Sequence, residues 1–69
     1  MKFNLNGADY IELIKLLKLL RIAQTGGHAK IMVEDGEVKL NGLVESRKRA
    51  KLRVGDIVET AGKRISIEQ

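Results

Sequence analysis

The sequence predicts an α+β fold in which two packed helices lie against a small, mainly antiparallel sheet. Leucine and isoleucine recur at helical spacing between residues 10 and 20. A second helical pattern covers about residues 26–35 and ends at Gly36. Beyond that glycine, short apolar runs alternate with turn-forming residues, which is typical of strands.

Size and composition indicate a small domain without covalent reinforcement. Sixty-nine residues form one domain, 1–69, whose apolar core is marginal. The chain has no cysteine, so neither disulfides nor thiolate metal sites can supplement that core. Its start does not resemble a signal peptide, and the apolar stretch from Ile11 to Leu20 is too short to span a bilayer. We therefore expect a cytoplasmic monomer with no membrane partner.

The N-terminal segment predicts a short strand and then the first helix. Phe3 and Leu5 alternate with polar residues before an Asn-Gly turn. Asp9 and Glu12 fit a capping box, with Asp9 as the N-cap and Glu12 reaching back from the third position. The first helix should therefore cover about residues 10–20.

One side of this helix is apolar and the other is basic. The apolar stripe consists of Leu13, Ile14, Leu16, Leu17 and Leu20, with Arg21 at its end. Lys15 and Lys18 lie on the opposite side. A helix on a membrane surface is the competing interpretation, which two lysines and no large aromatic residues disfavour.

The second helix should begin at Thr25, a plausible N-cap, and end at Gly36 in a left-handed cap. Its first turn contains Gly26 and Gly27, which cost roughly 1 kcal/mol each relative to alanine. Two explanations remain open. Either the glycines let a phosphate approach the positive end of the helix, or they pack this turn tightly against the first helix.

The rest of the chain predicts short strands joined by tight turns. Val38 and Leu40 precede an Asn41-Gly42 hairpin turn, and Leu43-Val44 begin the return. After a Gly55-Asp56 turn, the expected strands are residues 57–59 and 64–67, joined by a loop at 60–63. Ile65 and Ile67 should face the core.

The positive charge of the chain comes from one segment. Thirteen Lys and Arg stand against nine Asp and Glu, for a net charge of +4. Five of these basic residues, and no acidic residue, lie in the basic segment, residues 47–53: Arg47, Lys48, Arg49, Lys51 and Arg53. Outside that segment the balance is eight basic against nine acidic residues.

Alternation within the basic segment predicts a strand with two different faces. Arg47, Arg49, Lys51 and Arg53 would form one face, and Ala50, Leu52 and Val54 the other. Cations roughly 6.5–7 Å apart along a strand suit the backbone of a polyanion. The alternative is an edge strand charged to prevent pairing with another chain, although acidic residues would then normally be interspersed.

Catalytic chemistry finds no support in the sequence. His28 is the only histidine, so nucleophilic triads and the usual zinc ligand sets are absent. The glycines are not followed by the Lys-Ser/Thr of a phosphate-binding loop. We expect no enzyme, cofactor or metal, and His28 is either a plain surface residue or a phosphate contact.

Several short motifs together resemble the S4-type RNA-binding domain. They are Thr25-Gly-Gly-x-Ala-Lys30, Asp35-Gly-x-Val38, Val38-Lys-Leu-Asn-Gly42 and Val54-Gly-Asp56. Their order is more specific than any one of them, and it spans Ile11 to Glu59. The glycine pair and the Arg-Lys-Arg cluster look most like the small stand-alone bacterial branch of that family.

The resemblance implies the αL-motif fold, with an RNA-binding surface made by the paired helices and the following hairpin. Together with the charge pattern of residues 47–53 and the glycine-rich helix start, it makes these the expected RNA-binding residues: Thr25, Gly26, Gly27, His28, Lys30, Arg47, Lys48, Arg49, Lys51 and Arg53. Many members carry Ser-Arg where this chain has Thr25-Gly26, so one arginine contact is missing. More of the phosphate binding then depends on Lys30, Arg47, Arg49 and Lys51.

Two functional hypotheses follow. The first is a non-catalytic module that binds phosphates of structured or double-stranded RNA, either ribosomal or transfer RNA. Phe3 and Tyr10 are the only aromatic residues, too few for a reader of single strands that relies on several exposed rings. The second is an adaptor that uses the same fold to bind an acidic protein or DNA.

Overall fold

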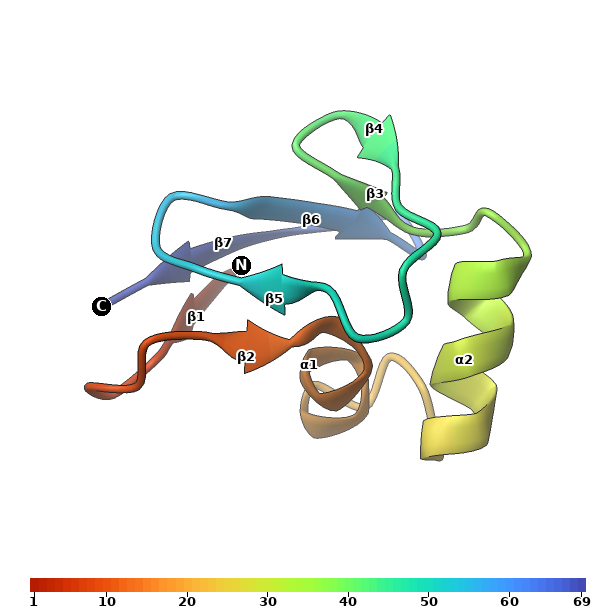
Figure 1. Cartoon of the computed structure of the whole chain (residues 1–69), viewed down its shortest axis with the longest axis horizontal. Coiled ribbons are helices and arrows are strands. Elements are labelled where there is room, and N and C mark those ends of the chain that lie inside the picture. The colour runs from red at the N-terminus through yellow and green to blue at the C-terminus, as the bar shows by residue number, and fades with distance from the viewer.

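The computed structural model describes all residues 1–69 and contains two helices and seven short strands (Figure 1). In chain order these are β1 (Lys2–Asn4), β2 (Ile11–Glu12), α1 (Leu13–Leu19), α2 (Gly26–Glu34), β3 (Lys39–Leu40), β4 (Leu43–Val44), β5 (Lys51–Leu52), β6 (Ile57–Thr60) and β7 (Lys63–Glu68). The predicted α+β fold is confirmed, with helices at both expected places.

The strands form two sheets. Five of them make one sheet in the order β1-β7-β6-β3-β4, and β2 pairs with β5 in a separate two-stranded ribbon. Every pair is antiparallel except β1–β7, where Phe3 lies beside Ile67. The sheet is therefore mainly antiparallel, as predicted, with one parallel pair that places the first and last strands side by side (Figure 1).

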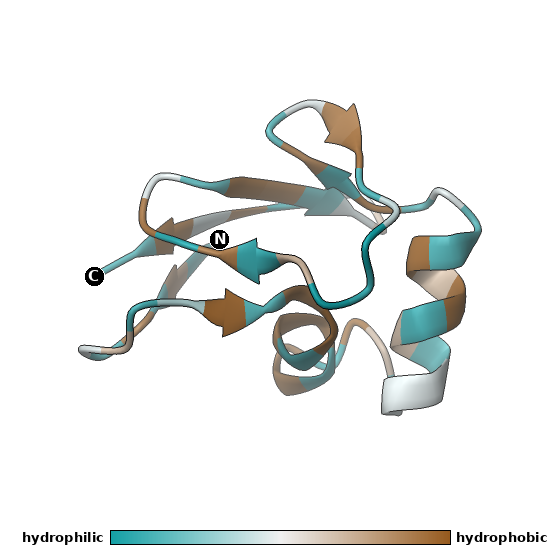
Figure 2. Cartoon of the chain, viewed as in Figure 1, coloured by the Kyte–Doolittle hydropathy of each residue, from teal (hydrophilic) through white to brown (hydrophobic).

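The core lies between the large sheet, the β2–β5 ribbon and the helices. Leu13, Leu16 and Leu17 of α1 are buried, as are Ile65 and Ile67 of β7, which confirms the predicted inward face of the last strand. Helix α1 packs against α2, which stands at one end of the molecule (Figure 1). Figure 2 shows hydrophobic stretches in α1 and the sheet, and a hydrophilic segment leading into β5.

The predicted start of the first helix is wrong. Helix α1 begins at Leu13, and its N-cap is Glu12, whose side chain makes no capping hydrogen bond. Asp9 is therefore not the N-cap. Ile11 and Glu12 are extended because they pair with β5, and the Leu13 N–H donates to the Ala50 carbonyl at 2.9 Å. Long-range pairing outweighs the local helical pattern here.

The end of the same helix also differs from the expectation. Helix α1 ends at Leu19, and Leu20 is its C-cap. Arg21, expected to end the apolar stripe, is exposed and has a left-handed backbone with φ 58°. The chain therefore leaves the helix before Arg21 could join the buried stripe.

Both caps of α2 are confirmed. The Thr25 side-chain oxygen accepts the His28 N–H at 3.0 Å, which satisfies one free amide of the first turn. Gly36 has φ 74° and donates its N–H to the Val33 carbonyl, while Glu37 donates to the Met32 carbonyl. These two bonds form a Schellman motif, which ends the helix where the sequence predicts.

The predicted hairpin turn at Asn41-Gly42 is present. Asn41 and Gly42 have φ values of 52° and 87°, as a two-residue hairpin turn between β3 and β4 requires. Ala61 and Gly62 repeat this geometry between β6 and β7. Gly55 has φ 95° in the turn that precedes β6.

Candidate nucleic-acid interface

The basic segment is not one continuous strand. Only Lys51–Leu52 is extended and paired. A turn precedes this strand and is closed by a hydrogen bond of 3.2 Å from the Ala50 N–H to the Arg47 carbonyl. Ala50 and Leu52 are buried as predicted, whereas Val54 is 56% exposed. The alternating pattern therefore predicts the burial of two apolar residues correctly and the shape of the segment incorrectly.

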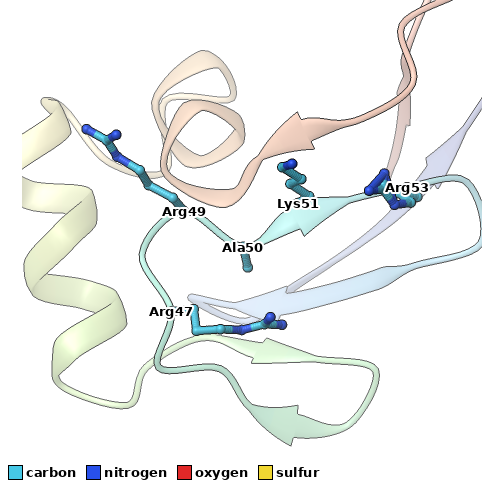
Figure 3. Close-up of a pocket in the computed structure, with 5 residues that line it drawn as sticks. All are labelled: Arg47, Arg49, Ala50, Lys51 and Arg53. Atoms are coloured by element: carbon cyan, nitrogen blue, oxygen red, sulfur yellow. The ribbon is translucent and has the colours of Figure 1, made fainter.

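Four cations nevertheless surround one shallow pocket of about 530 Å³, which we call the basic pocket. It is lined by Arg47, Arg49, Lys51 and Arg53, with Ala50 among them (Figure 3). Arg47 and Arg49 extend in different directions from the chain, Arg49 toward α1 and the start of α2 (Figure 3). The predicted straight row is replaced by cations arranged around a hollow, because the chain turns at residues 48–49.

Arg47 is held by a neighbouring carboxylate. Its guanidinium makes two hydrogen bonds to Glu45, Nη2 to Oε1 at 3.0 Å and Nε to Oε2 at 3.1 Å. The hydrogen bond from Arg47 lowers the pKa of Glu45, and the same bond raises the pKa of Arg47. The Arg47 side chain stays 74% exposed, so a second anion can still approach it.

Lys48 is also paired, but with a residue of α2. Its Nζ lies 2.7 Å from Oε2 of Glu34, which ties the basic segment to the last turn of that helix. Arg49, Lys51 and Arg53 have no carboxylate partner in the structure. The segment lacks acidic residues in sequence, yet contacts with residues outside it bring acidic partners to two of its five cations.

Tyr10 adds an aromatic ring to the edge of the basic pocket. The register of β2 with β5 places it across from Arg53, and its ring centroid lies 5.6 Å from Arg53 Cζ and 4.9 Å from Lys51 Nζ. Both distances lie within the range of cation–π interactions. The sequence pattern did not single out Tyr10, because only the pairing of two distant segments brings it to these cations.

The first turn of α2 contributes the other predicted site residues. Thr25 and His28 are engaged locally, since His28 Nδ1 also accepts the Gln24 N–H at 3.2 Å. Neither glycine has a close neighbour: a Cβ on Gly26 would meet nothing within 4 Å, and one on Gly27 only the Thr25 hydroxyl at 3.8 Å. Tight packing of this turn against α1 is therefore the wrong explanation for the glycine pair.

The ten predicted residues fall into two groups. Four line the basic pocket and Lys48 joins them to α2, while Thr25, Gly26, Gly27 and His28 lie at the other end of that helix. The two ends of α2 are about 12 Å apart along the helix axis. Lys30 is exposed one turn before Glu34, on the side of α2 that meets Lys48.

The side chains of the fold offer no metal site, and its helices offer no membrane span. No group of three or more His, Cys, Asp or Glu side chains could hold a metal ion. Neither helix is long and apolar enough to cross a membrane.

The family model of the S4 domain matches residues 3–68. The chain belongs to the S4 domain family. This membership agrees with the resemblance carried by the glycine, hairpin and Val-Gly-Asp motifs, and the match covers nearly the whole chain.

Two relatives match over most of their own length. YbcJ of Escherichia coli (strain K12) is 40% identical over 65 residues, which cover 94% of this chain and 93% of YbcJ. RlbA of Bacillus subtilis (strain 168), named a probable ribosome maturation protein, is 41% identical over 54 residues, 78% of this chain and 76% of RlbA. YbcJ carries the name "Putative RNA-binding protein YbcJ", which agrees with the prediction of a non-catalytic binding protein.

The solution structure of Escherichia coli YbcJ has the same fold. It superposes with a TM-score of 0.74 at 38% identity and covers 99% of this chain and 86% of YbcJ. That structure is described as revealing an "alfaL motif involved in RNA-binding". The predicted S4-type fold is thereby confirmed.

Proposed function

We propose that this protein is a non-catalytic RNA-binding protein that contacts phosphates of structured or double-stranded RNA through the basic pocket. The observation that carries the proposal is the pocket's lining, in which four of five residues are cations. A hollow with this lining attracts a polyanion and offers little to an apolar ligand.

The relatives support RNA as the polyanion and ribosomal RNA as the class to test first. The YbcJ structure is described as having a motif involved in RNA binding, and RlbA is named a probable ribosome maturation protein. Transfer RNA is the second structured RNA in this proposal. DNA and acidic proteins serve as comparison ligands.

Within the proposed site, the cations differ in whether a carboxylate of the protein already pairs with them. Arg49, Lys51 and Arg53 have no carboxylate partner, so they meet phosphate without first breaking an ion pair. Arg47 and Lys48 must share or exchange the carboxylates of Glu45 and Glu34. We assign the main phosphate contacts to the first three and auxiliary contacts to the other two.

The start of α2 provides a second point of contact. Gly26 and Gly27 leave room for a phosphate at the positive end of the helix, and Thr25, His28 and Lys30 are exposed around it. Arg49 points in the direction of this end in Figure 3. In the proposal, one stretch of RNA backbone passes from the basic pocket to the start of α2.

A salt titration tests the proposal. Four to six phosphate contacts give a slope of log K against log salt of roughly −3 to −5. Replacing Arg49, Lys51 and Arg53 together by Gln should weaken binding to unrelated structured RNAs by similar factors and flatten the slope by about two to three units. The measurement is fluorescence anisotropy with a ribosomal RNA hairpin and a DNA duplex of equal length.

A matched variant tests whether the loss of affinity comes from the basic pocket or from the lower net charge of the protein. Replacing Lys2, Lys63 and Arg64 by Gln removes the same charge outside the basic pocket and should leave most of the affinity. Equal losses in both triple variants would overturn the assignment of the site. Equal and weak binding of RNA and DNA by the wild-type protein would instead favour an adaptor that binds an acidic protein.

A further inference from the structure

A second hollow, of about 490 Å³, lies next to Tyr10 and is bordered by β1, β2 and α1. Its wall is mainly apolar and includes Phe3, Leu5, Tyr10 and Leu19, with Glu12 and Lys15 as its charged members. Tyr10 is 40% exposed and Leu19 is 56% exposed. We call it the Tyr10 hollow.

Tyr10 lies between the Tyr10 hollow and the basic pocket. It lines the Tyr10 hollow, and its ring lies within cation–π distance of Lys51 and Arg53, which line the basic pocket. Cross-strand pairing explains this position, since Ile11 and Leu52 point into the core while their neighbours Tyr10 and Arg53 lie on the outer side of the ribbon. An aromatic wall therefore borders the cations of the proposed phosphate site.

We propose that the Tyr10 hollow accepts one unstacked nucleobase of the bound RNA, which stacks on the Tyr10 ring while the adjoining phosphates meet Lys51 and Arg53. This inference rests on the proposed RNA-binding function and deepens it. A base has an apolar face for stacking and is joined to a phosphate on each side, which matches an aromatic, apolar hollow beside cations. The expected RNA is a duplex with a bulged or looped-out nucleotide rather than a perfect duplex.

Glu12 adds a preference among the bases. Glu12 lines the Tyr10 hollow, and its carboxylate takes part in no ion pair or capping hydrogen bond in the structure. An ionised carboxylate only accepts hydrogen bonds, so it favours a base with an exocyclic amino group, such as cytosine. Uracil has no such group and presents a carbonyl at the same position.

The test compares three RNA hairpins that differ at one place: fully paired, with one bulged cytidine, and with one bulged uridine. We expect the wild-type protein to bind the cytidine-bulged hairpin about tenfold more tightly than the paired one, the range that stacking of one base on an aromatic ring allows. The uridine-bulged hairpin should lie between them. Fluorescence anisotropy at a fixed salt concentration measures all three.

Three variants identify the residues responsible. Tyr10→Leu should abolish the preference for a bulge, and Tyr10→Phe, which keeps the ring, should retain it. Glu12→Ala should make the two bulged hairpins equal. Melting temperatures establish that each variant folds, and Tyr10→Phe shows whether any loss comes from the ring itself.

The outcomes separate this inference from the proposed function. Equal binding of all three hairpins by the wild-type protein, or an undiminished preference in Tyr10→Leu, overturns the base-binding hollow while leaving the phosphate-binding function intact. Failure of every hairpin to bind in a salt-dependent manner overturns the proposed function, and the inference with it. A cytidine preference that depends on Tyr10 but survives Glu12→Ala supports the stacking site and removes Glu12 from it.

Discussion

Asn41 and Asp56 join two turns that lie fifteen residues apart, through a hydrogen bond from Asn41 Nδ2 to Asp56 Oδ1 of 3.0 Å. Asn41 Oδ1 also accepts the Ile57 N–H, and Asp56 Oδ2 accepts the Arg53 N–H, both at 2.8 Å. Two of the residues that carried the family resemblance therefore hold the backbone of Arg53 in place. Their role here is to position the basic pocket, which they do not line.

Removing the Asp56 carboxylate should loosen both turns. We expect Asp56→Ala to lower the free energy of unfolding by about 1–2 kcal/mol, because two hydrogen bonds to a charged group are lost. RNA affinity should also fall, since the Arg53 backbone is no longer fixed. Urea unfolding checks the first effect and anisotropy the second. Asp35→Ala, which removes an exposed carboxylate with no hydrogen bond, is the control, and an equal change in both variants would contradict the role of Asp56.

The Lys48–Glu34 pair should restrain RNA binding more than it stabilises the fold. Both side chains are about half exposed, so Glu34→Gln should change the free energy of unfolding by less than about 1 kcal/mol. The same change frees Lys48 and removes an acidic group beside the proposed phosphate path. RNA affinity should rise, and the salt slope should steepen by about one unit. The exposed and unpaired Glu37, changed to Gln, is the matched control; an equal rise there would indicate a general charge effect.

Glu45 should make part of the stability depend on pH. Its pKa in the folded chain is lowered by the hydrogen bond from Arg47, so it contributes stability that is fully present above its unfolded pKa, about 4.3. That contribution is lost as the pH falls through the lower folded pKa. We expect the stability of Glu45→Gln to decline less between pH 6 and pH 3 than that of the wild type, as urea unfolding at a series of pH values would measure. Parallel declines would show that the pair contributes nothing.

Substitutions in the glycine pair should separate an effect on folding from an effect on RNA binding. Because nothing in the chain crowds Gly27, Gly27→Val should fold with a free energy of unfolding within about 1 kcal/mol of the wild type. Its side chain should still obstruct a phosphate at the start of α2 and weaken RNA binding. Gly26→Ala, which adds only a methyl group and favours the helix, serves as the control. Unchanged melting temperature together with unchanged affinity in Gly27→Val would remove this turn from the site.

The local sequence alone determined the helix caps and turns, because their hydrogen bonds join residues only a few positions apart. The Thr25 cap, the Gly36 stop and the Asn41-Gly42 turn each depend on a side chain or glycine at one position and on backbone partners nearby. Alternation likewise predicted the inward face of β7, since Ile65 and Ile67 are buried. The clustering of basic charge in residues 47–53 is a property of the sequence itself.

Tertiary structure decided the features that need a distant partner. Ile11 and Glu12 follow a helical pattern yet become a strand because Leu52 and Lys51 offer them backbone hydrogen bonds. The same pairing brings Tyr10 to Lys51 and Arg53, while packing of α2 brings Glu34 to Lys48. The sequence itself shows which residues are basic. Contacts between residues far apart in the chain decide which of these cations are free to bind an anion. These contacts form because they lower the free energy of the whole folded chain, and the sequence of a short segment cannot predict them.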